Sequence, residues 1–214
     1  MPSRLDALLA QPDIARLALH LAAHPGRAAD VEAPTRRAAI ALVLRASSAS
    51  AIGSEGGIEP ELLMIKRAEA ELDPWSGHIA CPGGRMEPAD RDLEQTAIRE
   101  TWEETGIDLA RDGRILGTLD DLEPRTPSLP PLVIRPFVAL VAREVEITQS
   151  AEVAEAFWVP LTSIREAAAW GRALVPIRNA GSREVDVFRH GSYTVWGLTH
   201  RALRQLLGAM RAGG

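Results

Sequence analysis

The chain has 214 residues, of which 46% are hydrophobic, and this length and composition suit one domain with short additions and a sizeable core. A formal net charge of −5 argues against a general binding surface for nucleic acid or for an anionic membrane. Because the single cysteine cannot form an internal disulfide, and the sequence shows neither a long uncharged apolar run nor a secretory signal pattern, we expect a cytoplasmic protein.

The first predicted elements are one helix and two buried strands. Residues 5–23 place apolar side chains at helical spacing and end before a Pro-Gly pair, so they predict an amphipathic helix. A membrane-surface or partner-binding role is an alternative for this helix, but its modest charge favours packing on the main domain. Two apolar runs bounded by charge, 37–45 and 61–67, predict neighbouring strands joined by a Ser/Gly-rich loop at 47–59.

A segment that begins with Gly83 and Gly84 carries most of the chemistry that the sequence shows. The two glycines predict a turn, since glycine adopts backbone conformations and close approaches that larger residues cannot. A helix follows and ends at Gly106, a residue type that commonly terminates helices. The apolar residues expected on the core-facing side of this helix are Ala97, Ile98 and Trp102.

Three carboxylates share one face of this helix. Because successive helical residues are about 100° apart, Glu100, Glu103 and Glu104 point the same way. A cluster of this kind often faces water, but Arg99 directly before it can orient or neutralise a carboxylate. An oxygen-only donor set suits a hard divalent cation such as Mg2+ or Mn2+ rather than zinc, which prefers histidine and cysteine.

Strands and helices also alternate in the second half of the chain. Pro136 indicates that the strand around it lies at a sheet edge or contains a bulge, because proline cannot donate a ladder hydrogen bond. The elements expected are strands at 114–120, 132–142 and 185–188, a proline-rich loop at 121–131, and helices at 161–170 and 194–210.

The run from Arg99 to Ile107, RETWEETGI, resembles the second half of the Nudix box. That family's pattern is a glycine, five residues, a glutamate, seven residues, then Arg-Glu, an aliphatic residue, any residue, Glu-Glu, any residue, glycine and an aliphatic residue. Thr101 replaces the aliphatic residue after Arg-Glu. Counting back along the pattern places Arg85 and Arg91 at the first glycine and the first glutamate, so the loop after Gly84 is one residue longer than usual.

The longer loop is similar to that of the coenzyme A pyrophosphatase branch of the family. Three further runs resemble that branch, at Pro82 to Gly84, at Glu87 to Asp90 and at Trp196 to Thr199. Its upstream signature is matched at Leu62, Leu63, Arg67 and Gly77, whereas Met64, Asp73 and Cys81 stand where threonine, arginine and phenylalanine are expected. Coenzyme A carries a 3′-phosphate, which a positively charged side chain such as the missing arginine would bind. The sequence therefore supports the type of reaction better than it supports coenzyme A as the substrate.

The resemblance implies an α/β (α+β) fold, the Nudix α/β/α sandwich around a mixed β-sheet. Residues 151–161 would complete this sheet. We expect an N-terminal helical extension at 1–35 and a Nudix hydrolase domain at 36–214. The alternation of strands and helices is the order that such a layered fold requires.

The resemblance also implies roles for the acidic residues. The ligands expected for Mg2+ or Mn2+ are Glu100, Glu103 and Glu104, and Arg99 would hold a glutamate in place. Glu103, Glu104 or a carboxylate remote from the box would deprotonate the attacking water. Glu152 is favoured over Glu155 as the remote carboxylate, and the alternative is that both are exposed loop residues.

The residues expected to contact phosphate surround the predicted turn. Gly83 and Gly84 shape the turn and Arg85 follows it, while Arg67 at the end of a strand either reaches a phosphate or is solvated. Glu87 or Asp90 would take the first acidic position of the box and stabilise the connection between loop and helix. His78, which precedes the turn, is interpreted as structural rather than as a base or a metal ligand.

These observations predict a divalent-metal-dependent enzyme that hydrolyses the pyrophosphate bond of a nucleotide substrate. The favoured substrate is coenzyme A or acyl-CoA, split into 3′,5′-ADP and (acyl-)4′-phosphopantetheine. The alternatives are another nucleoside diphosphate derivative, such as ADP-ribose or NADH, and a non-catalytic module that senses a nucleotide. The sensor is disfavoured because all three box glutamates are present. We expect a monomer or a homodimer that binds a coenzyme A-like small molecule.

Overall fold

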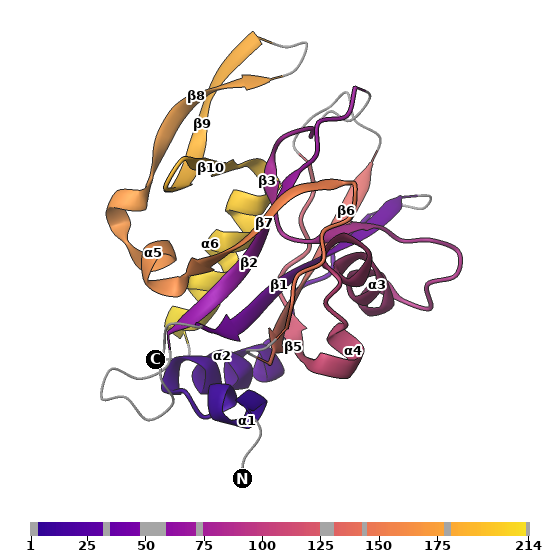
Figure 1. Ribbon diagram of the computed structural model, residues 1–214, viewed down its shortest axis with the longest axis vertical. Coiled ribbons are helices and arrows are strands. Elements are labelled where there is room, and N and C mark those ends of the chain that lie inside the picture. The colour runs from indigo at the N-terminus through magenta and orange to yellow at the C-terminus, as the bar shows by residue number, and fades with distance from the viewer. Residues whose placement is uncertain are drawn as a thin grey trace.

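A mixed β-sheet with helices on both faces forms the centre of the protein (Figure 1). The computed structural model describes residues 4–31, 35–47, 59–71, 75–124, 131–142, 145–177 and 181–212. Among these residues the sheet contains β1 (Arg36–Ala46), β2 (Pro60–Arg67), β3 (Ile79–Ala80), β4 (Gly83–Arg85), β5 (Gly113–Thr118), β6 (Leu132–Val141) and β7 (Val153–Pro160). This arrangement confirms the predicted α/β/α sandwich with a mixed sheet.

The centre of the sheet is the parallel pair of β1 and β6, and β1 also runs antiparallel to β2 and to β4. Contact between β1 and β2 covers only the pairs from Leu44↔Leu62 to Ala46↔Pro60. Beyond them β3 pairs with β2 and β4 pairs with β1, so residues 79–85 lie between the two strands. The glycines of β4 are thereby placed beside the carboxyl end of β2, where Arg67 lies.

The two faces of the sheet have separate cores. On one face, α3 (Leu93–Thr105) and α4 (Leu109–Asp112) pack on alternate residues of β1 and β6. On the other face lie α1 (Arg4–Leu9), α2 (Pro12–Ala23), α5 (Leu161–Arg165) and α6 (Gly197–Ala212). A second sheet joins this side, in the order β10 (Tyr193–Trp196), β9 (Gly181–His190) and β8 (Trp170–Ile177). Its β8–β9 hairpin extends away from the rest of the chain (Figure 1).

Local signals set both ends of α3. The Asp92 side chain accepts a hydrogen bond from the Gln95 backbone at 2.8 Å, which is an N-cap. Gly106 has a φ of 72° and donates its N–H to the Trp102 carbonyl, as predicted for a terminating glycine. The prediction that Trp102 faces the core is wrong, since its side chain is 57% exposed. Thr101 is buried instead, and its hydroxyl donates to the Ala97 carbonyl, so its polar group has a partner.

The N-terminal and C-terminal helices differ from their predictions at prolines and glycines. The single helix predicted at 5–23 is two helices, because Pro12 starts α2 and a proline clashes within a continuing helix. The helix predicted at 194–210 begins only at Gly197, where φ is 65° and β10 ends. The helix predicted at 161–170 is α5 followed by a short 3-10 turn, Ala167–Ala169.

The strand predictions at 37–45, 61–67, 114–120, 132–142, 151–161 and 185–188 are confirmed, whereas β8 and β10 were not predicted. The prediction that Pro136 marks an edge is wrong, because β6 lies between β1 and β5. A register shift does occur nearby, in β5 between Ile115 and Gly117. Residues 48–58 and 125–130 of the two predicted loops lie outside the described residues. Among the helices of the described ranges, none has both the length and the apolar character needed to cross a membrane.

Candidate active site

The glycine pair and α3 meet in an unusually close approach. The prediction of a turn at Gly83 and Gly84 is wrong, because both lie in the extended strand β4. The reason given for glycine holds: a Cβ on Gly83 would overlap the backbone of Ala39 and Ile40, and Gly83 has a φ of 152°. A Cβ on Gly84 would overlap the Glu100 carboxylate. The two glycines therefore let α3 bring its carboxylates against the sheet.

Glu104 is the most deeply placed of these carboxylates. Its side chain is 4% exposed, and its Oε2 accepts the Gly83 N–H at 2.8 Å. Its Oε1 lies 3.8 Å from Nη1 of Arg67. Burial raises the pKa of Glu104 to about 7, although the Gly83 hydrogen bond and the charge of Arg67 oppose that rise. The negative charges of Glu100 and Glu152 raise the pKa further, so these three carboxylates lie within electrostatic reach of one another.

Glu100 and Glu103 are less buried and share one arginine. Burial raises the pKa of Glu100, while Arg99, whose Nη1 lies 3.1 Å from Oε1 of Glu100, lowers it. The same Nη1 donates to Oε2 of Glu103 at 2.8 Å, and the Glu103 side chain is 47% exposed. The three glutamates of the box therefore differ. A backbone N–H binds the Glu104 carboxylate, whereas the Arg99 side chain binds the carboxylates of Glu100 and Glu103.

Asp90 fixes Arg99 in turn. Nε and Nη2 of Arg99 donate to the two Asp90 carboxylate oxygens, each at 3.0 Å. The Glu87 backbone and the Thr96 hydroxyl donate to the same carboxylate, both at 2.9 Å. These hydrogen bonds, the one from Arg99 above all, lower the pKa of Asp90 to about 2 despite its burial. Of the two residues left open for the first acidic position of the box, Glu87 and Asp90, it is Asp90 whose carboxylate binds Arg99.

The two candidates for a remote carboxylate lie on different faces. The Glu152 carbonyl accepts the N–H of Ala68, which places the exposed Glu152 beside Arg67 and within electrostatic reach of Glu100 and Glu104. The Glu155 carboxylate instead accepts the hydroxyl of Tyr193, on the face covered by α6. The geometry thus favours Glu152. The Arg85 side chain is exposed, and its carbonyl accepts a hydrogen bond from Arg99 at 3.0 Å.

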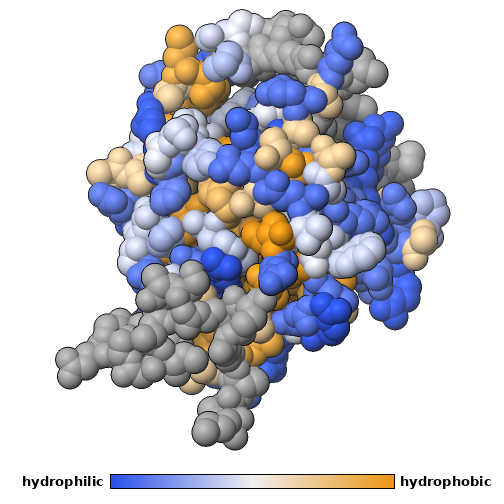
Figure 2. Space-filling model, in the orientation of Figure 1, coloured by the Kyte–Doolittle hydropathy of each residue, from blue (hydrophilic) through white to orange (hydrophobic). Residues whose placement is uncertain are grey.

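The chemistry of this donor set fits a hard divalent cation. Glu100, Glu103, Glu104 and Glu152 offer carboxylate oxygens, and their mutual repulsion is the kind that a bound cation relieves. In the described part of the chain, these side chains do not converge into a ready-made cage, and Arg99 and Arg67 hold three of them. Hydrophilic residues cover the side of the molecule formed by α3 and α4 (Figure 2).

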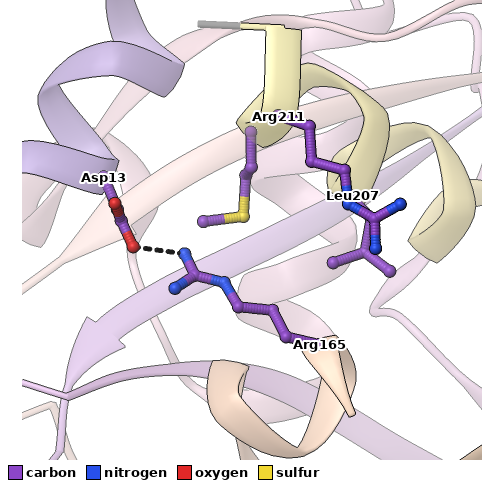
Figure 3. A pocket seen from close by; sticks show the side chains of 5 residues that line it. Asp13, Arg165, Leu207 and Arg211 are labelled. Carbon is purple, nitrogen blue, oxygen red and sulfur yellow. Dashed lines mark ion pairs between the residues drawn. The ribbon is translucent and has the colours of Figure 1, made fainter. Parts of the chain in front are cut away.

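A pocket of about 230 Å³ lies on the opposite side of the sheet, between α2, α5 and α6. Asp13 points into it and pairs with Arg165 at 2.5 Å, while Leu207 and Arg211 come from α6 (Figure 3). Asp13 also pairs with Arg16. Because none of the carboxylates around Glu104 lines this pocket, we regard it as a junction between helices rather than part of the site.

Gly84→Ala is expected to lower the pyrophosphate hydrolysis predicted from the sequence at least roughly tenfold, while changing the free energy of unfolding by less than about 1 kcal/mol. The added methyl group displaces the Glu100 carboxylate, which is the movable end of a side chain, and Gly84 lacks a positive φ. Activity assays and urea unfolding check this. The control is Gly208→Ala on α6, where a Cβ meets nothing within 4 Å and activity should be unchanged. Equal activity of Gly84→Ala and the wild type would contradict the placement of Glu100.

Comparisons with known proteins find a matching family and several related chains. Residues 35–177 match the family description "NUDIX domain". The chain is 30% identical over 149 residues to an uncharacterised Nudix hydrolase, NudL, of Photorhabdus laumondii, covering 69% of this chain and 76% of that one. It is 31% identical over 143 residues to the human mitochondrial coenzyme A diphosphatase NUDT8, covering 65% of this chain and 58% of that one.

Some relatives are longer, since the chain spans 44% of one curated relative and 58% of another. Among solved structures, a MutT/nudix family protein from Enterococcus faecalis is similar in fold, with a TM-score of 0.55 and 15% identity. That likeness covers 86% of this chain and 65% of the other and concerns the fold alone.

Proposed function

This chain belongs to the Nudix family, and we propose that it is a divalent-metal-dependent hydrolase of the pyrophosphate bond in nucleoside diphosphate derivatives. The observation that carries this proposal is the buried Glu104 carboxylate, bound to the Gly83 N–H and facing Arg67. It lies within electrostatic reach of Glu100 and Glu152. Carboxylates can bind metal ions and the neighbouring Arg67 can bind a phosphate, so this group suits a phosphate-carrying substrate that binds together with metal ions.

Each part of the site has a separate task in this proposal. Glu100, Glu103 and Glu104 hold Mg2+ or Mn2+, which when bound supplies charge neutralisation at the phosphate oxygens and polarisation of water. Arg67 contacts a phosphate oxygen, and its long side chain reaches toward Glu104 from the end of β2. Arg99, held by Asp90, keeps Glu100 and Glu103 oriented.

We assign the proton acceptor to the Glu152 carboxylate. Both oxygens of Glu104 are engaged, by Gly83 and by Arg67, and Glu103 is bound to Arg99. Glu152 directly precedes β7 and is exposed, so water reaches it, and it lies within electrostatic reach of Glu100 and Glu104. A general base must be able to accept a proton from water in the site. Ion pairs with Arg67 and Arg99 engage the other three carboxylates, whereas Glu152 is exposed.

The substrate that we favour is coenzyme A or an acyl-CoA, split into 3′,5′-ADP and (acyl-)4′-phosphopantetheine. Support comes from the resemblance of the box and of residues 196–199 to the coenzyme A branch, and from the relative named as a coenzyme A diphosphatase. Asp73, which stands where that branch has an arginine, lies outside the described residues.

With Mg2+ or Mn2+ present, turnover of coenzyme A is expected to exceed turnover of ADP-ribose and of NADH, and EDTA is expected to prevent all three reactions. Chromatography of the products, including 3′,5′-ADP, measures each rate. Faster hydrolysis of ADP-ribose than of coenzyme A would show the substrate assignment to be wrong while leaving the reaction type intact. Binding of these nucleotides without hydrolysis under any metal would instead support a nucleotide sensor.

A further inference from the structure

Two partly exposed aromatic side chains lie one strand away from Arg67. The rings of His78 and Trp196 pack against each other with centroids 4.7 Å apart and an angle of 57° between the rings. His78 immediately precedes β3, and Trp196 is the last residue of β10, which contacts β3. The Arg67 N–H donates to the His78 carbonyl at 3.0 Å, so the aromatic pair is anchored directly beside the arginine that faces Glu104.

The connection that presents His78 is held by specific hydrogen bonds. The Ser76 hydroxyl donates to the Glu69 carboxylate at 2.7 Å and accepts the Ala70 N–H at 2.9 Å. Gly77 has a φ of 71°, and a Cβ on it would crowd that same Glu69 carboxylate. The His78 N–H donates to the Trp75 carbonyl at 3.1 Å. His78 is therefore held in place by the fold, and it supports the indole of Trp196.

We propose that Trp196, supported by His78, is the platform on which the base of the nucleotide stacks. A ribose separates the base of a nucleotide from its phosphates, so a base platform belongs a short distance from the phosphate-binding group. Trp196 has such a position, because it packs on His78, whose carbonyl accepts the Arg67 N–H. Indole rings stack on nucleotide bases, and purines present the larger face. The proposal rests on the proposed function in that it places the phosphates at Arg67 and the carboxylates.

A second aromatic pair, Phe157 and Tyr193, is engaged by contacts of its own. Phe157 and Tyr193 stack on each other with centroids 4.1 Å apart, and the Tyr193 hydroxyl is bound to Glu155. Both rings pack against the core between the large sheet and α6. Trp196 differs because it lies at the end of β10, followed by the exposed Gly197, and packs on His78, whose carbonyl accepts the Arg67 N–H.

The test measures binding rather than turnover, with ADP and inorganic pyrophosphate as probes and Mg2+ present. Trp196→Ala is expected to weaken ADP binding about tenfold or more, because stacking on an aromatic ring supplies that much per base, and to leave pyrophosphate binding within about twofold. Trp196→Phe should retain most of the ADP affinity. Trp102→Ala, which removes a 57% exposed tryptophan from α3, is the matched control and should bind both probes as the wild type does.

The ratio of ADP affinity to pyrophosphate affinity within one variant does not depend on the fraction of molecules that are folded. An unchanged ratio in Trp196→Ala would overturn the platform, and so would a wild type that binds ADP no more tightly than pyrophosphate. If the wild type shows no hydrolysis of any substrate, yet its ADP binding depends on Trp196, the platform is supported and the proposed hydrolase activity is wrong. If hydrolysis proceeds and Trp196→Ala keeps the wild-type ratio, the hydrolase stands and the platform fails.

Discussion

Glu104→Gln is expected to lower the turnover number roughly 10²- to 10⁴-fold while the protein stays folded. Glutamine has nearly the shape of glutamate, and its carbonyl oxygen still accepts the Gly83 N–H. What it removes is the negative charge, in a place where the side chain is 4% exposed and Arg67 is the facing cation. In the proposed site, a divalent cation would then lose its most deeply buried carboxylate ligand, which the more exposed Glu103 and Glu152 would not replace.

The fold should tolerate this change well. Burial disfavours the charged form of Glu104, as its raised pKa indicates, so a neutral side chain of the same shape relieves a cost of burial. We therefore expect the thermal midpoint of the metal-free variant to equal or exceed that of the wild type. Glu94→Gln, on an exposed position of the same helix, is the control and should retain full turnover. Retention of turnover by Glu104→Gln would show that the metal lies elsewhere.

The helix that carries the site was predictable because its signals are local. Gly106 acts through a hydrogen bond within α3, and the end of the helix was predicted from it. Asp92 caps the start through an equally local hydrogen bond, although no start was predicted. The same holds for the buried strands β1 and β2, whose apolar runs need no knowledge of their partners. The sharing of a face by Glu100, Glu103 and Glu104 follows from helical geometry alone.

The differences between those glutamates were not predictable, because they arise from contacts distant in sequence. Glu104 is buried since β4 brings Gly83 against it, whereas Glu103 remains half exposed one residue earlier. Trp102 was expected in the core because it is apolar, yet α3 buries Thr101 instead. The strand β8 contains Gly171 and Pro176, residue types that argue against a strand, and pairing with β9 overrides that local preference.

Asp90 shows how a residue left as an alternative becomes central once its partners are known. Nothing in the sequence separates it from Glu87, but in the fold it joins Arg99, Thr96 and the backbone of Glu87. The loop after Gly84, one residue longer than the Nudix pattern, thus still brings an acidic side chain to Arg99. Counting residues along the Nudix pattern does not distinguish Asp90 from Glu87, whereas the contact with Arg99 in the fold does.

Asp90→Asn is accordingly expected to lower the free energy of unfolding by about 2 kcal/mol, because the variant loses the charge that binds Nε and Nη2 of Arg99, while Glu100 and Glu103 still pair with its Nη1. Arg99 is 18% exposed and Asp90 3%, so solvent replaces little of what is lost. Urea unfolding measures the change. The control is Asp92→Asn, the same substitution at the exposed N-cap of α3, where asparagine caps as well as aspartate and the change should stay below about 0.5 kcal/mol.

The effect of Asp90→Asn should also depend on pH. The folded-state pKa of Asp90 is about 2, below its ordinary value of 3.8, so the ionised carboxylate stabilises the fold above about pH 4. This contribution, about 2 kcal/mol, is lost as the pH falls from about 4 toward 2, since the unfolded chain then takes up the proton first. The stability difference between wild type and Asp90→Asn should therefore shrink between pH 6 and pH 3. A difference that stays constant over this range, with Asp92→Asn as the baseline, would contradict an ionised Asp90 as the anchor of Arg99.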